Sequence, residues 1–195
     1  MEFYKEPVGK DRYYYIFTDA KIKQSWSDFT GERRSDSYGT PDRLFVIDFT
    51  DEDEIFDALS EEGVVPVSIY IPKNNTDPQT KPVKKLTVKM IYREGEKWDF
   101  LRPTVRLIST TNGVETPITE ETLDCLKNAI ITKANVTLRM HNWVNMGKPG
   151  VTAQLVDGEF YSSGSSEFVP PYRQKEATSQ PAVEPYQNAD DDLPF

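Results

Sequence analysis

Seven short segments rich in β-branched and aromatic residues constrain the fold of this chain more than any other feature of its sequence. Each is bounded by turn-forming residues, a pattern typical of strands. With 195 residues, the chain is long enough to build one well-buried core. The sequence therefore predicts a mainly β domain, a small barrel or sandwich, with strands at 13–17, 44–49, 64–71, 86–92, 104–108, 136–143 and 151–156.

Two short helices are expected between these strands. Thr50 is placed to cap the first helix, whose initial turn carries the acids of 51–53 where the helix dipole stabilises them. Thr119 precedes the second helix in the same way. The apolar residues predicted to face the core are Ile55, Phe56 and Leu59 in the first helix and Leu123, Leu126 and Ile130 in the second.

The composition changes at Ser162, after which Ser, Pro, Gln, Glu and Ala dominate and aliphatic residues are few. Such a composition cannot bury enough apolar surface to fold, so the last part of the chain is expected to be a disordered acidic tail. The predicted organisation is a folded domain at 1–161, a flexible linker at 162–189 and an acidic tip at 190–195.

The tip is chemically suited to docking on another protein. Phe195 offers a ring to an apolar pocket and a carboxylate to a neighbouring base, and the preceding acids suit a wider basic rim. The tip consists of Asp190, Asp191, Asp192, Leu193, Pro194 and Phe195, and it resembles the partner-docking tip of bacterial single-stranded DNA-binding proteins. That resemblance implies replication or repair proteins, from a host or a phage, as its partners.

The net charge of −9 is unusual for a protein that contacts phosphates. However, residues 164–195 hold six acids and two bases, and residues 51–62 add seven acids without a base. The rest of the domain is slightly basic. Its bases gather at 81–93 and at 133–148, two stretches without any acid, so one basic face is possible on an acidic protein.

The strand at 136–143 is the best candidate for a functional surface. Its period of two places Val136 and Leu138 on one side and Arg139, His141 and Trp143 on the other. A guanidinium, an imidazole and an indole in a row suit phosphate contact and base stacking. The alternative is that Trp143 closes the end of a barrel and Arg139 pairs with an acid.

Two further segments carry similar residues. In the strand at 86–92, Lys89 and the following Arg93 share the outward phase, whereas Tyr92 shares the inward phase of the core. The loop-rich stretch 25–43 interleaves aromatics with arginines, and Arg can itself stack on a base. Phe29 and Tyr38 could instead anchor this loop to the core, and Trp98 is either loop cover or a base platform. The candidates in the stretch are Trp26, Phe29, Arg33, Tyr38 and Arg43.

The segment Arg139-Met140-His141-Asn142-Trp143, with Gly147-Lys148 and Gly150-Val151 after it, resembles the hairpin of phage-encoded single-stranded DNA-binding proteins of OB-fold type. That family typically has Arg-Pro-Tyr-Asn-Trp in the strand and an aromatic at the position of Gln154. Phe29, Gly31, Arg43 and Phe45 also fall where the family tends to have an aromatic, a glycine, a base and Phe. The resemblance implies an OB-fold-like barrel and a role in phage DNA replication or recombination inside a bacterium.

Together these features predict a non-enzymatic, cytoplasmic protein that coats single-stranded DNA with little sequence preference. The predicted DNA-binding residues are Trp26, Phe29, Arg33, Tyr38, Arg43, Phe45, Lys89, Arg93, Trp98, Arg139, Trp143 and Lys148. No cofactor, metal or membrane partner is expected, because one cysteine and one histidine cannot form a zinc site and no apolar run is long enough to span a bilayer. The sequence leaves open whether the protein forms a homo-oligomer.

Two alternatives remain at this point. The first is an adaptor that uses the tip to recruit or titrate host proteins and binds no DNA. The second is a metal-dependent nuclease built on Asp48, Asp51, Asp53 and Glu54. The helix start already accounts for most of these acids, and the chain has no Walker-type phosphate loop.

Overall fold

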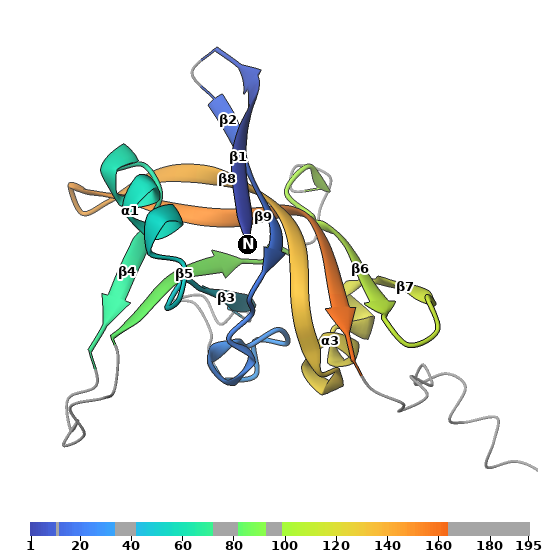
Figure 1. Cartoon of the computed structure of the whole chain (residues 1–195). Helices are drawn as coiled ribbons and strands as arrows, with labels where there is room; N and C mark the ends of the chain where they lie inside the picture. Colours follow the sequence, from blue (N-terminus) through green and yellow to red (C-terminus); the bar gives the residue numbers. More distant parts are fainter. Residues whose placement is uncertain (11, 34–41, 72–81, 93–98, 164–195) are drawn as a thin grey trace, which may run out of the picture.

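The computed structural model describes residues 1–10, 12–33, 42–71, 82–92 and 99–163. Within them, nine strands form one sheet, in which β1-β2-β8-β9-β5-β3 are hydrogen-bonded in that order, β4 joins β5, and β6 joins both β7 and β9 (Figure 1). The strands are β1 (Glu2–Gly9), β2 (Arg12–Ala20), β3 (Leu44–Asp48), β4 (Val67–Tyr70), β5 (Val83–Lys89), β6 (Thr104–Ser109), β7 (Glu115–Ile118), β8 (Ile131–Asn145) and β9 (Lys148–Ser162).

The order of the five central strands is that of an OB-fold. Taken along the chain, β2, β3, β5, β8 and β9 are the first to fifth strands of such a barrel, and the third and fifth, β5 and β9, run parallel. Residues 21–28 return along the free edge of β3 through isolated bridges, Ile22 to Ile47 and Asp28 to Leu44. Over the residues that the structure describes, the sheet is not closed by a continuous ladder. The mainly β, OB-fold-like class predicted from the sequence is confirmed.

The antiparallel hairpin of β8 and β9 positions most of the candidate site. Each strand has 15 residues, and side chains alternate between the core and the opposite face of the sheet. Val136 and Leu138 point inward, as predicted, and are at most 2% exposed. Phe17 and Phe160 complete the aromatic centre of the core and are fully buried.

The opposite side of the same strands forms what we call the outer sheet face. Direct pairing places Arg139 of β8 beside Gln154 of β9, and Gln154 beside Lys89 of β5. Paired residues project to the same side of a sheet, and so does every second residue along each strand. The residues two positions before Gln154 and Lys89, and two positions after Arg139, therefore lie on the same face. The outer sheet face comprises Leu44 and Val46 on β3, Lys85, Thr87 and Lys89 on β5, Gly150, Thr152 and Gln154 on β9, and Arg139, His141 and Trp143 on β8.

The first helix, α1 (Asp53–Glu62), buries Phe56 and Leu59 as predicted and ends at Gly63, whose φ of 67° is readily available to glycine. The predicted cap is wrong, because the N-cap is Glu52. The Thr50 hydroxyl instead donates a hydrogen bond to the Asp48 carboxylate.

The second helical segment is shorter than predicted. A 3₁₀ turn (Glu120–Thr122) leads into α3 (Asp124–Asn128), and Thr119 forms a capping box with Thr122. Leu126 is fully buried, but Ile130 is 66% exposed because α3 ends two residues before it.

Two strands were not predicted, β1 and β7. β1 lies at the edge of the sheet, has β2 as its one partner among the described strands, and contains Lys5 and Pro7 among mostly exposed residues. An edge strand of this kind lacks the alternation of a half-buried strand. In the described part of the chain, no helix is long and apolar enough to cross a membrane.

Candidate nucleic-acid interface

A groove of about 370 Å³ lies on the outer sheet face over β3 and β5. Leu44 and Val46 form its floor and are only 3% exposed, although they are not part of the core cluster. Side chains from the segment after β2 and from the end of β4 line the groove with them. The residues that line the groove are Ser25, Trp26, Arg33, Leu44, Val46, Tyr70, Lys85 and Thr87.

Two aromatic rings meet in this groove, and two lysines lie close to one of them, Lys85 in the lining of the groove and Lys23 outside it. The rings of Trp26 and Tyr70 are in edge-to-face contact, with centroids 5.0 Å apart and an interplanar angle of 84°. The ammonium of Lys85 lies 4.9 Å from the centre of the Trp26 ring, and that of Lys23 lies 5.6 Å away. Aromatic surface beside positive charge is the pairing that single-stranded nucleic acid requires, because bases stack and phosphates seek cations.

Trp26 was predicted to contact DNA, but Tyr70 and Lys85 were not in the predicted set. Tyr70 is 44% exposed at the end of β4, a short strand whose pairing with β5 is not visible in the sequence. Lys85 could have been found, because it shares the outward phase of Lys89 on β5. Arg33 lines the groove as well, where its guanidinium donates to the Ser27 carbonyl and lies 3.8 Å from the Asp28 carboxylate.

Arg139 and Lys89 occupy the outer sheet face but already have protein partners. The Nε of Arg139 donates to Oε1 of Gln154 at 2.9 Å, and its two other nitrogens donate to the carbonyls of Phe100 and Leu101 at 3.3 and 3.4 Å. Burial lowers the pKa of Arg139 from its ordinary value. Lys89 pairs with Asp42 at 2.8 Å. Gln154, where the family has an aromatic, thus serves as an acceptor for Arg139.

Trp143 is held as an open aromatic platform and does not close the end of a barrel. A Cβ placed on Gly150, its partner on β9, would lie 2.2 to 2.6 Å from three carbons of the indole, so the ring lies directly over this glycine. Its Nε1 donates to Oγ1 of Thr152 at 2.9 Å. The side chain is still 41% exposed, and it shares the outer phase of β8 with the exposed His141. Lys148 is exposed where β9 begins.

Phe29 and Phe45 were predicted to stack on bases, and this is wrong. Phe45 is fully buried and Phe29 is 3% exposed. Their rings stack on each other with centroids 6.2 Å apart, and both meet Phe160 edge-on. Phe45 shares the inward phase of β3 with Ile47, so neither ring can reach a ligand without opening the core.

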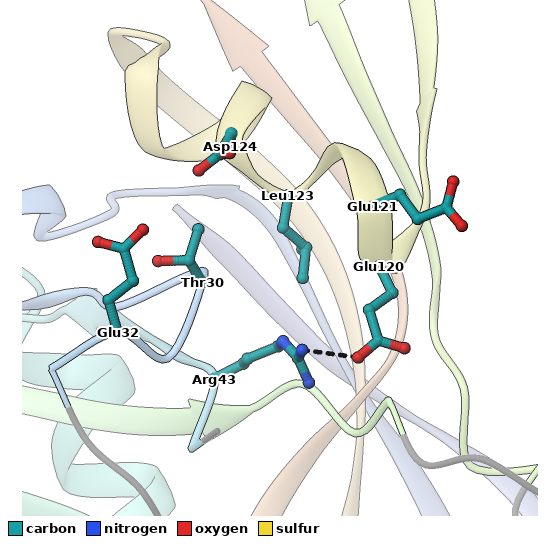
Figure 2. A pocket seen from close by; sticks show the side chains of 7 residues that line it. All are labelled: Thr30, Glu32, Arg43, Glu120, Glu121, Leu123 and Asp124. Atoms are coloured by element: carbon teal, nitrogen blue, oxygen red, sulfur yellow. Dashed lines mark hydrogen bonds and ion pairs between the residues drawn. The ribbon is translucent and has the colours of Figure 1, made fainter. Parts of the chain in front are cut away.

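Arg43 was predicted to contact phosphate, but it lies in a separate pocket of about 200 Å³ (Figure 2). Its Nη2 donates to Oε1 of Glu120 at 2.6 Å, and its guanidinium lies 5.7 Å from the centre of the Tyr92 ring. The side chain is 11% exposed. The pocket is lined by Thr30, Glu32, Arg43, Glu120, Glu121, Leu123 and Asp124, and its four carboxylates would repel a phosphate.

The remaining predicted residues cannot be placed. Tyr38, Arg93 and Trp98 lie outside the described residues, as does the whole tip, Asp190, Asp191, Asp192, Leu193, Pro194 and Phe195.

Three of the four acids considered for a nuclease, Asp48, Asp51 and Asp53, pair with lysines. Asp48 accepts hydrogen bonds from Lys23 and from Thr50, and Asp53 pairs with Lys84 at 2.9 Å. Across the described ranges, no group of three or more His, Cys, Asp or Glu residues could hold a metal ion.

The sequence matches no protein-family model and no curated protein. Among solved structures, the chain is similar to the C-terminally truncated single-stranded DNA-binding protein of bacteriophage Enc34, with a TM-score of 0.46 and 8% identity over 84% of this chain and 95% of that one. The same phage protein in complex with single-stranded DNA gives 0.45 and 9% over 84% and 97%. The single-stranded DNA-binding protein gp2.5 of bacteriophage T7 gives 0.37 and 11% over 91% and 100%.

These structural neighbours are phage single-stranded DNA-binding proteins, the family that the hairpin sequence resembles. Because the TM-scores lie below 0.5, we base the function of this chain on its own side chains.

Proposed function

We propose that this protein is a non-enzymatic single-stranded DNA-binding protein. The observation that carries the proposal is the groove over β3 and β5, where Trp26, Tyr70 and Lys85 bring stacking surface and positive charge together. The second and third strands of an OB-fold, here β3 and β5, are the usual binding face for oligonucleotides. The groove therefore lies where this fold binds its ligands.

The bound strand runs across the outer sheet face, from the groove toward the β8–β9 hairpin. Bases stack on Trp26 and Tyr70 in the groove and on the Trp143 platform, while Lys85 and Arg33 contact phosphates. Stacking and backbone contact do not distinguish one base from another, so binding has little sequence preference. Arg139 supports the face indirectly, because it ties the segment at Phe100 and Leu101 to Gln154.

The tip extends this function to other proteins. In the proposal, residues 190–195 recruit replication or repair proteins once the domain has bound DNA. An acidic tail tethered to a DNA-binding domain also competes with DNA for the basic side chains. Deletion of residues 190–195 is therefore expected to tighten DNA binding, most at low salt, and an unchanged affinity at low salt would contradict the competition.

The direct test is a titration of the intrinsic fluorescence of the three tryptophans with a short dT strand at two salt concentrations. A duplex of equal length is the control. We expect saturable quenching by the single strand, weaker binding at high salt, and much weaker binding of the duplex. Absence of quenching and of a mobility shift would contradict DNA binding and favour an adaptor that acts through its tip.

A further inference from the structure

The turn between β8 and β9 carries a residue that folding alone does not favour. Only Met146 and Gly147 separate the two strands, and both have positive φ, 49° and 77°. A two-residue turn with this geometry prefers Asn, Asp or Gly at both positions. Gly147 meets that demand, whereas Met146 holds a long apolar side chain in the left-handed region, where L-residues are disfavoured.

Met146 is also unfavourable in its exposure to water. It is 96% exposed, and the nearby Val144 is 74% exposed. Among the described residues, neither belongs to the core cluster or packs against it. β4 occupies the edge of β5 up to Leu86, where β9 would otherwise continue, and the turn stands out at the edge of the molecule beyond α1 in Figure 1. The turn thus presents apolar side chains away from the body.

The hairpin that carries the turn has a charge that suits a nucleic acid. The hairpin from Arg139 to Gln154 has no acidic residue, although the chain has 32. Trp143, near the end of β8, lies three residues before Met146, and the exposed Lys148, at the start of β9, lies two residues after it. A polyanion that stacks a base on Trp143 therefore reaches Met146 with its next bases.

Resting on the proposed DNA-binding function, we propose that this turn is an apolar wedge that inserts Met146 between adjacent bases of the bound strand and unstacks them. Unbranched and other apolar side chains part base steps in this way in proteins that deform DNA. The flexible, polarizable thioether suits a gap of variable shape. The protein would then remove stacked structure from a single strand as well as cover it.

The experiment uses the full chain and dT oligonucleotides that carry two adjacent 2-aminopurines, with the pair moved along the strand. Stacked 2-aminopurines are dim, so separation of the pair raises their fluorescence. The wild type is expected to give a clear rise at one or two positions. Met146→Asn, which suits the turn better, should reduce that rise by more than half while the affinity for plain dT changes less than threefold. Met146→Leu, still apolar, should keep the rise.

Each other outcome overturns the wedge. An equal rise in wild type and Met146→Asn at saturation would contradict it and leave DNA binding intact. If the wild type did not bind dT, both the proposed function and the wedge would be contradicted. If Met146→Asn left the probes unchanged but lowered the molar mass in light scattering, the turn would be a contact between copies of this chain.

Discussion

The groove over β3 and β5 and the pocket around Arg43 are neighbours on one strand segment, yet they suit opposite purposes. Leu44 forms the groove floor, and the adjacent Arg43 enters the pocket. The groove combines part-exposed aromatics with cations that can reach a ligand. The pocket pairs its guanidinium with Glu120, has three further carboxylates in its lining, and lies beside the buried Tyr92 ring. The neighbours of an arginine, more than its charge, therefore decide whether it can bind phosphate.

The largest effect on binding is expected from the groove itself. Trp26→Ala removes a base platform, which is worth about 1–3 kcal/mol per base, so affinity for a dT strand should fall roughly 5- to 150-fold. Anisotropy of a labelled oligonucleotide measures this without relying on tryptophan emission. Thermal unfolding should change little, because Trp26 packs on the surface groove and not in the core. Equal affinity for wild type and variant would remove the groove from the interface.

The stability of the folded protein is expected to depend on pH through Tyr92, whose ring lies beside Arg43. Burial raises the pKa of Tyr92 from 10.0 to about 12, with Arg43 opposing and Glu120 adding to the shift. The folded protein thus holds this proton where the unfolded chain releases it. The stabilisation is complete below pH 10 and is lost between about pH 10 and 12, by up to about 2 kcal/mol.

Urea unfolding at pH 8, 10, 11 and 12 checks this loss. Tyr92→Phe is the matched variant, and its stability should fall less steeply over the same interval. The pKa values of Tyr15 and Tyr161 are also raised by burial, so the difference between the two proteins is the quantity to compare. Because the Tyr92 hydroxyl is buried and has no hydrogen-bond partner among the described residues, Tyr92→Phe should not destabilise the protein at pH 8. Parallel curves would show that this hydroxyl does not titrate in that window.

A smaller effect is expected at the Trp143 platform. Gly150→Ala places a methyl group where the indole lies, so the ring must leave its position over β9. Affinity for dT should drop by about 1 kcal/mol, roughly fivefold, the lower end of the contribution of one stacked base. Thr152→Val, which removes only the acceptor for Nε1, should lose less. Full affinity in Gly150→Ala would mean that the platform is not used.

The sequence predicted the outer face of β8 correctly because residues 134–141 of that strand alternate strictly between apolar and polar side chains. The apolar run at 44–49 has no such alternation, so nothing in it showed that Phe45 points inward while Leu44 and Val46 form the groove floor. The meeting of Trp26 with Tyr70 depends on the non-local pairing of β4 with β5. Composition can place aromatics near arginines, but only the pairing decides which of them share a surface.

The groove and the pocket are distinguished most sharply by the salt dependence of DNA binding. Each phosphate contact to a single strand contributes about −0.7 to the slope of log K against log salt concentration. Lys85→Ala should therefore make the slope shallower by about 0.7, because its ammonium lines the groove. Arg43→Gln removes an equal charge from the pocket and should leave the slope unchanged, since the Arg43 guanidinium pairs with Glu120.

Glutamine can still donate to Glu120, so Arg43→Gln is expected to fold. Circular dichroism at both salt extremes checks the fold of each variant. The two variants lose the same formal charge, so any general electrostatic effect of the net charge appears equally in both. A shallower slope in Lys85→Ala alone assigns the phosphate contact to the groove. The same reduction in both variants would place Arg43 at the DNA despite its carboxylates, and the distinction between groove and pocket would fail.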